Sequence, residues 1–227
     1  MFNVLIALPI IYAAVAYLVA PLAWDFIDRK LPFSDGAPKL TETANRRPGD
    51  PLNVVLVGSE ASVKAAMNEA GWLEADPLGL RTGLEIAADI VLERPYATAP
   101  VSRLYLYGRS EDMAFEQPSG HDPDTRHHVR FWKMPAKAGA LVPSWIGAAS
   151  FDRGIGFSRV TGQMTHHIAP DVDRERDGLG ADLKKAGALT ETYMLPGFHE
   201  VLSGQNGGGD PWVSDGALWV GVVSEPD

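Results

Sequence analysis

The sequence contains no cysteine. It therefore excludes disulfides, thiolate nucleophiles and cysteine-ligated zinc or iron–sulfur sites. Positive charge is also scarce: 20 Lys and Arg residues stand against 29 Asp and Glu residues, so the formal net charge is -9. An acidic chain argues against nonspecific nucleic-acid binding, which requires a basic surface. No G-x-S-x-G, H-E-x-x-H or Walker motif is present, so none of the enzyme classes that these motifs mark is indicated.

One stretch of the chain lacks charge altogether. Residues 1–24 contain no Asp, Glu, Lys, Arg or His, and residues 4–24 as a helix would extend about 30 Å, the thickness of a hydrocarbon core. We therefore predict a transmembrane anchor that contacts the lipid bilayer through residues 4–24. The alternatives are a cleaved signal peptide, which usually has a basic start, and a buried core helix, which is seldom uncharged over this length. Basic residues after the anchor favour a cytoplasmic domain but leave its side of the membrane open.

Two further parts are predicted after the anchor. Residues 25–50 contain three Pro, two Gly and equal numbers of basic and acidic residues, which is typical of a tether. Residues 51–227 are predicted to form one soluble domain. This domain opens with a buried strand over residues 52–58, and Ser59 is suited to cap the helix that follows.

The rest of the domain is predicted to alternate strands with a few helices. A helix is expected over 171–186 and a short one over 83–93. Several strand-like runs include two hairpins, with turns at 151–154 and 215–216. The predicted fold class is α+β, with a mixed or mostly antiparallel sheet and two or three helices, preceded by one transmembrane helix.

Histidine and arginine gather in a first cluster, residues 121–132. In a strand, successive side chains point to opposite faces, so Arg126, His128 and Arg130 share one face and His127 turns to the core. Two arginines beside a histidine suit a carboxylate or phosphate group. The three residues on the shared face are therefore candidate ligand-binding residues.

A second cluster, residues 165–177, reads as a strand that runs into a helix. Asp171 suits the N-cap and Asp173 the first turn. If the clusters converge, His128, Arg130, His166 and Asp171 are the catalytic candidates. Weak candidates for ligating a divalent metal such as zinc are His128, His166, Asp171 and Asp173. No cofactor is assigned, because a metal site, a metal-free anion or catalytic pocket and a purely structural polar network all fit these residues.

Five motifs carry a resemblance to a known family: PLNVVLVGS at 51–59, APVSRLYLYGR at 99–109, RHHVRFW at 126–132, WIGAAS at 145–150 and THHIAPDVDRERD at 165–177. In these motifs the chain resembles the LssY-like C-terminal domain family, over roughly residues 50–190. The resemblance implies a bacterial envelope setting associated with secretion, with the domain often attached to membrane proteins. It transfers no catalytic residues. His167 stands where relatives tend to carry lysine, which favours His166 of the pair.

These observations predict a membrane-anchored protein of the bacterial inner membrane with a single pass. We expect a noncatalytic ligand-binding or assembly module, with a membrane protein as a candidate partner and no nucleic acid. The alternative is a membrane-tethered hydrolase, metal-assisted or acid–base, that acts on a phosphoester through the His, Arg and Asp residues of the two clusters.

Overall fold

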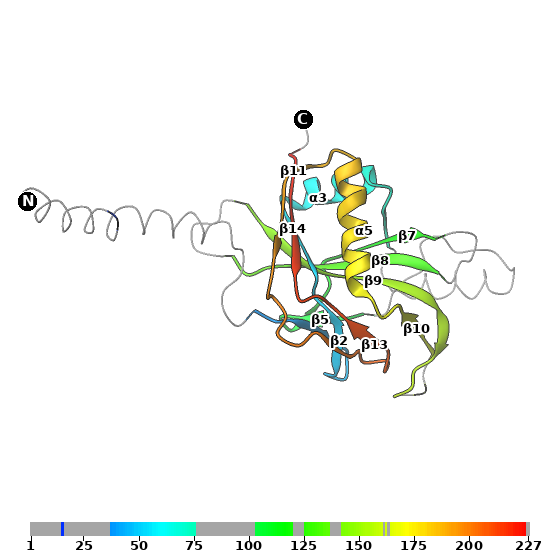
Figure 1. The fold of residues 1–227 in the computed structure, drawn as a ribbon. Helices are drawn as coiled ribbons and strands as arrows, with labels where there is room; N and C mark the ends of the chain where they lie inside the picture. Colours follow the sequence, from blue (N-terminus) through cyan, green and yellow to red (C-terminus); the bar gives the residue numbers. More distant parts are fainter. Residues whose placement is uncertain are drawn as a thin grey trace, which may run out of the picture. The chain divides into compact units, whose positions relative to one another are not determined.

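The computed structural model describes residues 37–75, 103–119, 125–136, 142–160 and 164–225, together with Val15 and Gly162. The described residues form two helices and fourteen strands (Figure 1). The helices are α3 (Glu60–Glu69) and α5 (Val172–Lys185). The strands are β1 (Leu40–Glu42), β2 (Pro48–Pro51), β3 (Val54–Val57), β4 (Leu73–Glu74), β5 (Tyr105–Leu106), β6 (Arg109–Ser110), β7 (Met113–Pro118), β8 (Arg126–Lys133), β9 (Ser144–Phe157), β10 (Met164–Ile168), β11 (Leu189–Leu195), β12 (Ser203–Gln205), β13 (Pro211–Val213) and β14 (Leu218–Val223).

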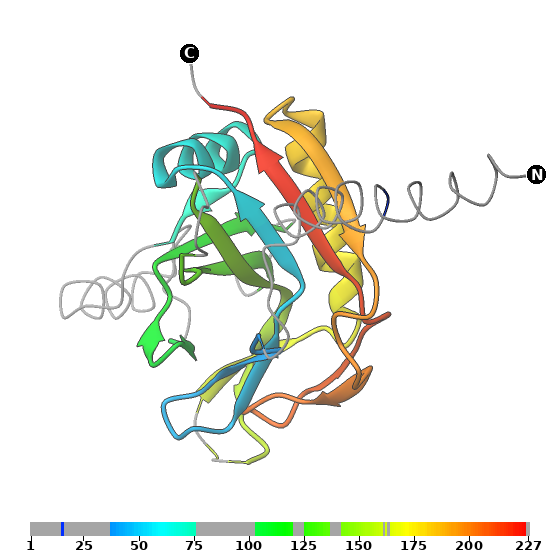
Figure 2. The same ribbon diagram turned by 90° about the vertical axis from the view of Figure 1, so that its left-hand side faces the viewer.

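The largest sheet has eight strands. Seven follow the order β11-β14-β3-β9-β8-β7-β4, and β10 pairs with the far end of β9. The β14–β3 pair is parallel and the other pairs of this sheet are antiparallel. A four-stranded sheet, β2-β1-β5-β6, and the β12–β13 pair complete the described fold (Figure 2).

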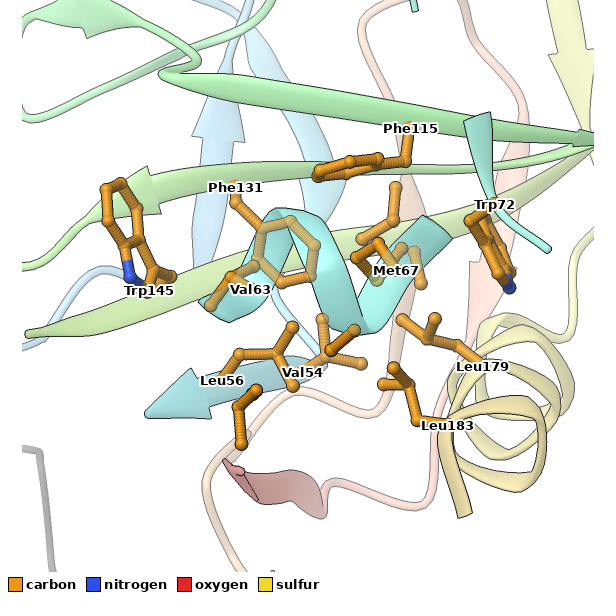
Figure 3. Close-up of a cluster of buried hydrophobic side chains, with 14 of the residues drawn as sticks. Val54, Leu56, Val63, Met67, Trp72, Phe115, Phe131, Trp145, Leu179 and Leu183 are labelled. Carbon is orange, nitrogen blue, oxygen red and sulfur yellow. The ribbon is translucent and has the colours of Figure 1, made fainter. Parts of the chain in front are cut away.

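Both helices pack on one face of the large sheet, where they enclose the main core. Val54 and Leu56 of β3 and Phe131 of β8 meet the apolar sides of the helices there (Figure 3). Leu179 and Leu183 of α5 are fully buried in the same cluster. Burial of apolar side chains drives this packing, and the other face of the sheet carries the polar residues of β8 together with buried apolar side chains such as Trp132 and Ile146.

Both helix starts are as predicted. The Ser59 hydroxyl accepts a hydrogen bond from the backbone N–H of Ser62 (3.1 Å) at the start of α3. The Asp171 carboxylate accepts one from the N–H of Arg174 (3.1 Å) at the start of α5. These bonds satisfy backbone donors that have no partner within the helix.

The predicted fold class is wrong for the part of the chain that the structure describes. Regular structure there is mostly β-sheet, with two helices. The short strands before, between and after the two helices pair into sheets. The helices contain 10 and 14 residues, and no helix among the described residues is long and apolar enough to cross a membrane. The anchor helix predicted over residues 4–24 and the short helix predicted over 83–93 lie outside the described residues, apart from Val15.

Both predicted hairpin turns are also wrong. Residues 151–154 lie inside the continuous strand β9, which bends toward β10 (Figure 1), and the β9–β10 pairing shifts register between His166 and Ile168. Such an irregularity turns a strand without ending it. Residues 215–216 connect β13, which pairs with β12, to β14, which pairs with β11 and β3. Residues 40–42 and 48–51, in and next to the predicted tether, form the strands β1 and β2.

Candidate functional site

A pocket of about 250 Å³ opens on the face of the large sheet opposite to the helices. His128 and Arg130 of β8, Asp152 of β9 and His166 of β10 form part of its lining. Residues 43–50, around the β1–β2 connection, and residues 206–208, between β12 and β13, complete much of the wall. The pocket therefore joins segments that are far apart in the sequence.

Alternation along β8 places the basic residues toward this pocket. Arg126, His128 and Arg130 are at most 5% exposed, whereas Val129 and Phe131 belong to the helix-side core. His127 also faces the helices, where its Nδ1 lies 2.9 Å from the Glu175 carboxylate. The predicted division of β8 into a polar face and a core face is thus the observed one.

Arg126 connects a buried carboxylate to a pocket histidine. Its Nη1 donates to Oε2 of Glu116 (2.9 Å), and its Nη2 lies 3.2 Å from Nε2 of His166. An arginine can only donate, so Nε2 of His166 accepts and is unprotonated in this arrangement. Burial is the largest effect on the pKa of His166 and lowers it; Asp152 raises it, and Arg126 lowers it further.

His128 is held from both sides of its ring. Its Nε2 lies 2.9 Å from Nη1 of Arg130 and 2.9 Å from the Ser150 hydroxyl. The guanidinium again requires Nε2 to accept, which assigns the ring proton to Nδ1. Nδ1 lies 3.1 Å from Oδ2 of Asp152, although the two atoms are not aligned for a hydrogen bond.

Asp152 places a buried carboxylate in the pocket wall. Its side chain is 1% exposed, and neither oxygen has an aligned hydrogen-bond donor among the described residues. Burial by itself would raise the pKa of Asp152, but its contact with His128 and the positive charge of Arg130 hold this pKa below its ordinary value. The carboxylate is therefore ionised at neutral pH.

The rim of the pocket adds two exposed arginines and a second carboxylate. Arg47 and Arg103 both line the opening. Asp50 is buried; its Oδ2 lies 3.5 Å from Nη1 of Arg130, and its Oδ1 accepts a hydrogen bond from Asn206 (3.1 Å). The lining thus contains three guanidinium groups and two carboxylates.

The candidates predicted from sequence separate into two groups. His128, Arg130 and His166 line the pocket, and Arg126 lies against His166. Asp171 caps α5 instead, and the Asp173 carboxylate accepts from the Ser214 hydroxyl (2.9 Å). Within the described ranges, no group of three or more His, Asp or Glu side chains is arranged to hold a metal ion.

A match to a known protein family identifies the domain that contains this pocket. The family model described as the LssY C-terminus matches residues 34–218. The chain belongs to this family. The resemblance found in the sequence motifs is thereby confirmed, and the match spans every residue that lines the pocket. No curated protein and no solved structure matches the chain.

Two acidic residues of the LssY C-terminal pocket escaped the sequence-based prediction. Asp152 stands opposite Arg126 in the β8–β9 register, but the sequence placed it in a turn. Asp50 was assigned to the tether. The available signal for Asp152 was its place among aliphatic and small residues after a strand-like run, where an unpaired acid is expensive to bury.

The two adjacent histidines of the second motif face different pockets. His166 lines the first pocket, and His167 lines a second one of about 230 Å³ beside Arg153 and Arg159. Nδ1 of His167 lies 2.8 Å from Oδ1 of the buried Asp210. The predicted divergence of the pair agrees with this arrangement, since neighbouring strand residues point apart.

Proposed function

We propose that this LssY C-terminal domain binds a small anionic ligand in the first pocket and holds it without chemical conversion. The observation that carries the proposal is the lining of three guanidinium groups, from Arg47, Arg103 and Arg130, on a chain whose net charge is -9. Guanidinium groups are well matched to carboxylate and phosphate oxygens. A local positive field on an acidic protein favours an anion at that place.

The electrostatic balance of the pocket supports an anion. Arg126 and Glu116 form a pair behind the lining and offset each other. Nη1 of Arg130 lies 3.5 Å from Oδ2 of Asp50, a longer distance than in a usual charged hydrogen bond. Arg47 and Arg103 lie at the opening, and together with Arg130 they give the lining three positive charges against the two carboxylates of Asp50 and Asp152.

The state of the histidines supports binding rather than hydrolysis. A general base needs an available lone pair. In His128 and in His166 the unprotonated Nε2 lies against a guanidinium donor. The Ser150 hydroxyl competes with Arg130 for the same nitrogen and is 1% exposed, so it lacks both an available base and access to a substrate. The phosphoester hydrolase expected as the alternative has no activated nucleophile on this lining.

Calorimetric titration of the purified full chain with inorganic phosphate tests the proposal. We expect saturable binding that weakens with added salt, because a partly exposed anion site is screened. Arg47→Gln should weaken binding about two- to fivefold, the size of one exposed charge pair. Arg174→Gln removes an equal charge from the exposed side of α5 and should leave the affinity unchanged.

An absence of phosphate binding would count against the anion site. Steady turnover of 4-nitrophenyl phosphate that disappears in His166→Gln would instead overturn the noncatalytic part of the proposal, because it would require a histidine that exchanges protons with the substrate.

A further inference from the structure

We propose that the second pocket is a separate binding site for a phosphate or sulfate group, and that His167 takes up a proton when such a group binds. Arg153, Arg159 and Asp210 line this pocket together with His167, and no described residue lines both pockets. The site therefore stands apart from the anion site proposed above. Its ligand class follows from two cationic side chains beside a histidine that a buried carboxylate holds in place.

A buried carboxylate fixes the ring of His167. Nδ1 of the ring lies 2.8 Å from Oδ1 of Asp210, whose side chain is 1% exposed. Oδ2 of Asp210 accepts a hydrogen bond from the backbone N–H of Ile168 (3.3 Å), so the carboxylate is held as well. An ionised carboxylate can only accept, which assigns a proton to Nδ1 of His167. Nε2 is then the ring nitrogen that can meet a ligand.

Nε2 of His167 is open to a ligand, unlike Nε2 of His128 and of His166, which lies against an arginine in each case. It forms no hydrogen bond with any described residue and is not fully buried. The side chain as a whole is 24% exposed. A Cβ at Gly156 would lie 2.5 Å from Nε2, so another residue at this position would cover the atom.

Two arginines give the pocket a positive charge. Nε of Arg153 donates to the backbone oxygen of Ile168 (3.1 Å), which orients the guanidinium; Nη1 and Nη2 have no partner among the described residues. Arg159 is exposed and forms no ion pair within the same part of the chain. Asp210 is the only acidic residue of the described lining, and residues 153–170 contain neither Asp nor Glu. Two guanidinium groups against one carboxylate favour an anion here.

The chemistry of Nε2 requires a proton for anion binding. A neutral ring with its proton on Nδ1 presents a lone pair at Nε2, which cannot donate to an anionic oxygen. The protonated ring donates from both nitrogens, to Asp210 and to the anion. Asp210 favours this state and the two positive arginines of the lining oppose it, and the charge of a bound anion shifts the balance toward it. The proton comes from solution and adds to Nε2.

A tetrahedral oxyanion suits these three donors better than a carboxylate does. A phosphate or sulfate group has three or more acceptor oxygens, so Arg153, Arg159 and protonated His167 can each meet an acceptor of its own. A carboxylate offers only two oxygens. The volume of about 230 Å³ has room for such a group.

NMR titration of the full chain with sodium sulfate tests the site. Sulfate keeps the same charge between pH 6 and pH 8, so an effect of pH reports on the protein. The imidazole signals of His167, assigned with His167→Gln, should shift and saturate. Binding should be about three- to tenfold weaker at pH 8 than at pH 6, because less of the imidazole is protonated. Methyl sulfate, titrated in parallel, separates two sources of the group: tighter binding of the ester assigns the site to an esterified ligand, and tighter binding of sulfate assigns it to a free ion.

Matched variants separate the pocket from its surroundings. Arg153→Gln should weaken sulfate binding about two- to fivefold, the size of one exposed charge pair. Arg174→Gln removes an equal charge from α5, outside the pocket, and should have no effect. Gly156→Ala should remove most of the His167 shift by covering Nε2, whereas Gly178→Ala, whose Cβ would meet nothing within 4 Å, should retain it.

Failure of this site and failure of the first pocket give different results. His167 signals that do not move with sulfate would overturn the second site, and weaker phosphate binding in Arg47→Gln would then support the first pocket alone. Equal sulfate affinity at pH 6 and pH 8 would overturn the proton uptake by His167. Equal losses in Arg153→Gln and Arg174→Gln would reduce the effect to net charge and overturn the site. Because the wild-type titrations decide the first two outcomes, the test does not depend on the folding of a variant.

Discussion

Nη2 of Arg126 lies 3.2 Å from Nε2 of His166, although the two residues are 40 positions apart in the chain. The contact forms because β8 and β10 both pair with β9. The ends of the two strands therefore lie close together, and the two side chains meet on the same face of the sheet. Protonation of His166 at Nε2 would direct a new N–H at a guanidinium that cannot accept it. The arginine therefore favours the neutral imidazole, in the same direction as burial.

This contact predicts a neutral His166 at physiological pH. Burial and Arg126 lower the pKa of His166 below 6.5 despite the opposing field of Asp152. In an NMR titration of the imidazole signals, with the His166→Gln variant used for assignment, the midpoint of this residue should fall below that value. A midpoint at 6.5 or above would contradict the arrangement described for Arg126 and His166.

Two glycines of α5 predict opposite responses to the same substitution. A Cβ at Gly178 would meet nothing within 4 Å, so Gly178→Ala should raise the free energy of unfolding by about 0.5–1 kcal/mol through helix propensity. A Cβ at Gly180 would lie 2.9 Å from the indole of Trp219, so Gly180→Ala should lower it by about 1–3 kcal/mol. Urea unfolding of both variants checks this pair, and changes of equal sign would contradict the packing of α5 on β14.

Arg176 predicts a large loss of stability from one charge on the same helix. Its side chain is 3% exposed and forms ion pairs with Asp173 (3.1 Å) and Asp215 (2.8 Å). Because the Asp215 carboxylate is 54% exposed, water replaces part of the lost interaction, so Arg176→Gln should lower the free energy of unfolding by about 1–3 kcal/mol, less than the cost of breaking a fully buried pair. The neighbouring exposed Arg174→Gln should change it by at most about 0.5 kcal/mol. Similar effects of the two variants would show that the network contributes little.

Local features of this fold could be predicted from the sequence. The alternation over residues 126–132 placed His128 and Arg130 on the pocket face and His127 toward the core, because strand geometry has a fixed period of two. Ser59 and Asp171 were identified as helix caps because side-chain oxygens at these positions meet unpaired backbone donors. In each case the interaction involves residues within a few positions of each other.

Features that depend on distant pairing could not be predicted. Asp152 was placed in a turn, since nothing local shows that β9 continues through it and pairs with both β8 and β10. Asp50 lies in a segment rich in Pro and Gly that becomes β2 only through pairing with β1. Asp171 was a candidate to join the histidines, but its cap position fixes it at the start of α5. Strand register is set by the assembled sheet rather than by neighbouring residues.

The dependence of stability on pH should show two histidines acting in opposite directions. Burial lowers the pKa of His199, and its Nε2 donates to the backbone oxygen of Leu52 (2.7 Å). The hydrogen bond to Glu175 is the main reason why the pKa of His127 is raised; burial opposes it. When the pKa of a histidine is lower in the folded chain, the unfolded chain binds more protons below about pH 6.5. When the pKa is higher in the folded chain, the folded chain binds more protons above about pH 6.5.

Urea unfolding at pH 5, 6, 7 and 8 separates the two effects. His199 should cost stability as the pH falls below 6.5, so the wild-type chain should lose more than His199→Gln between pH 7 and pH 5. The contribution of His127 should be complete below 6.5 and disappear as the pH rises through its raised folded pKa. The stability difference between wild type and His127→Gln should therefore grow from pH 8 to pH 6. Parallel curves for the wild type and a variant would mean that this histidine has the same pKa in the folded and unfolded chain.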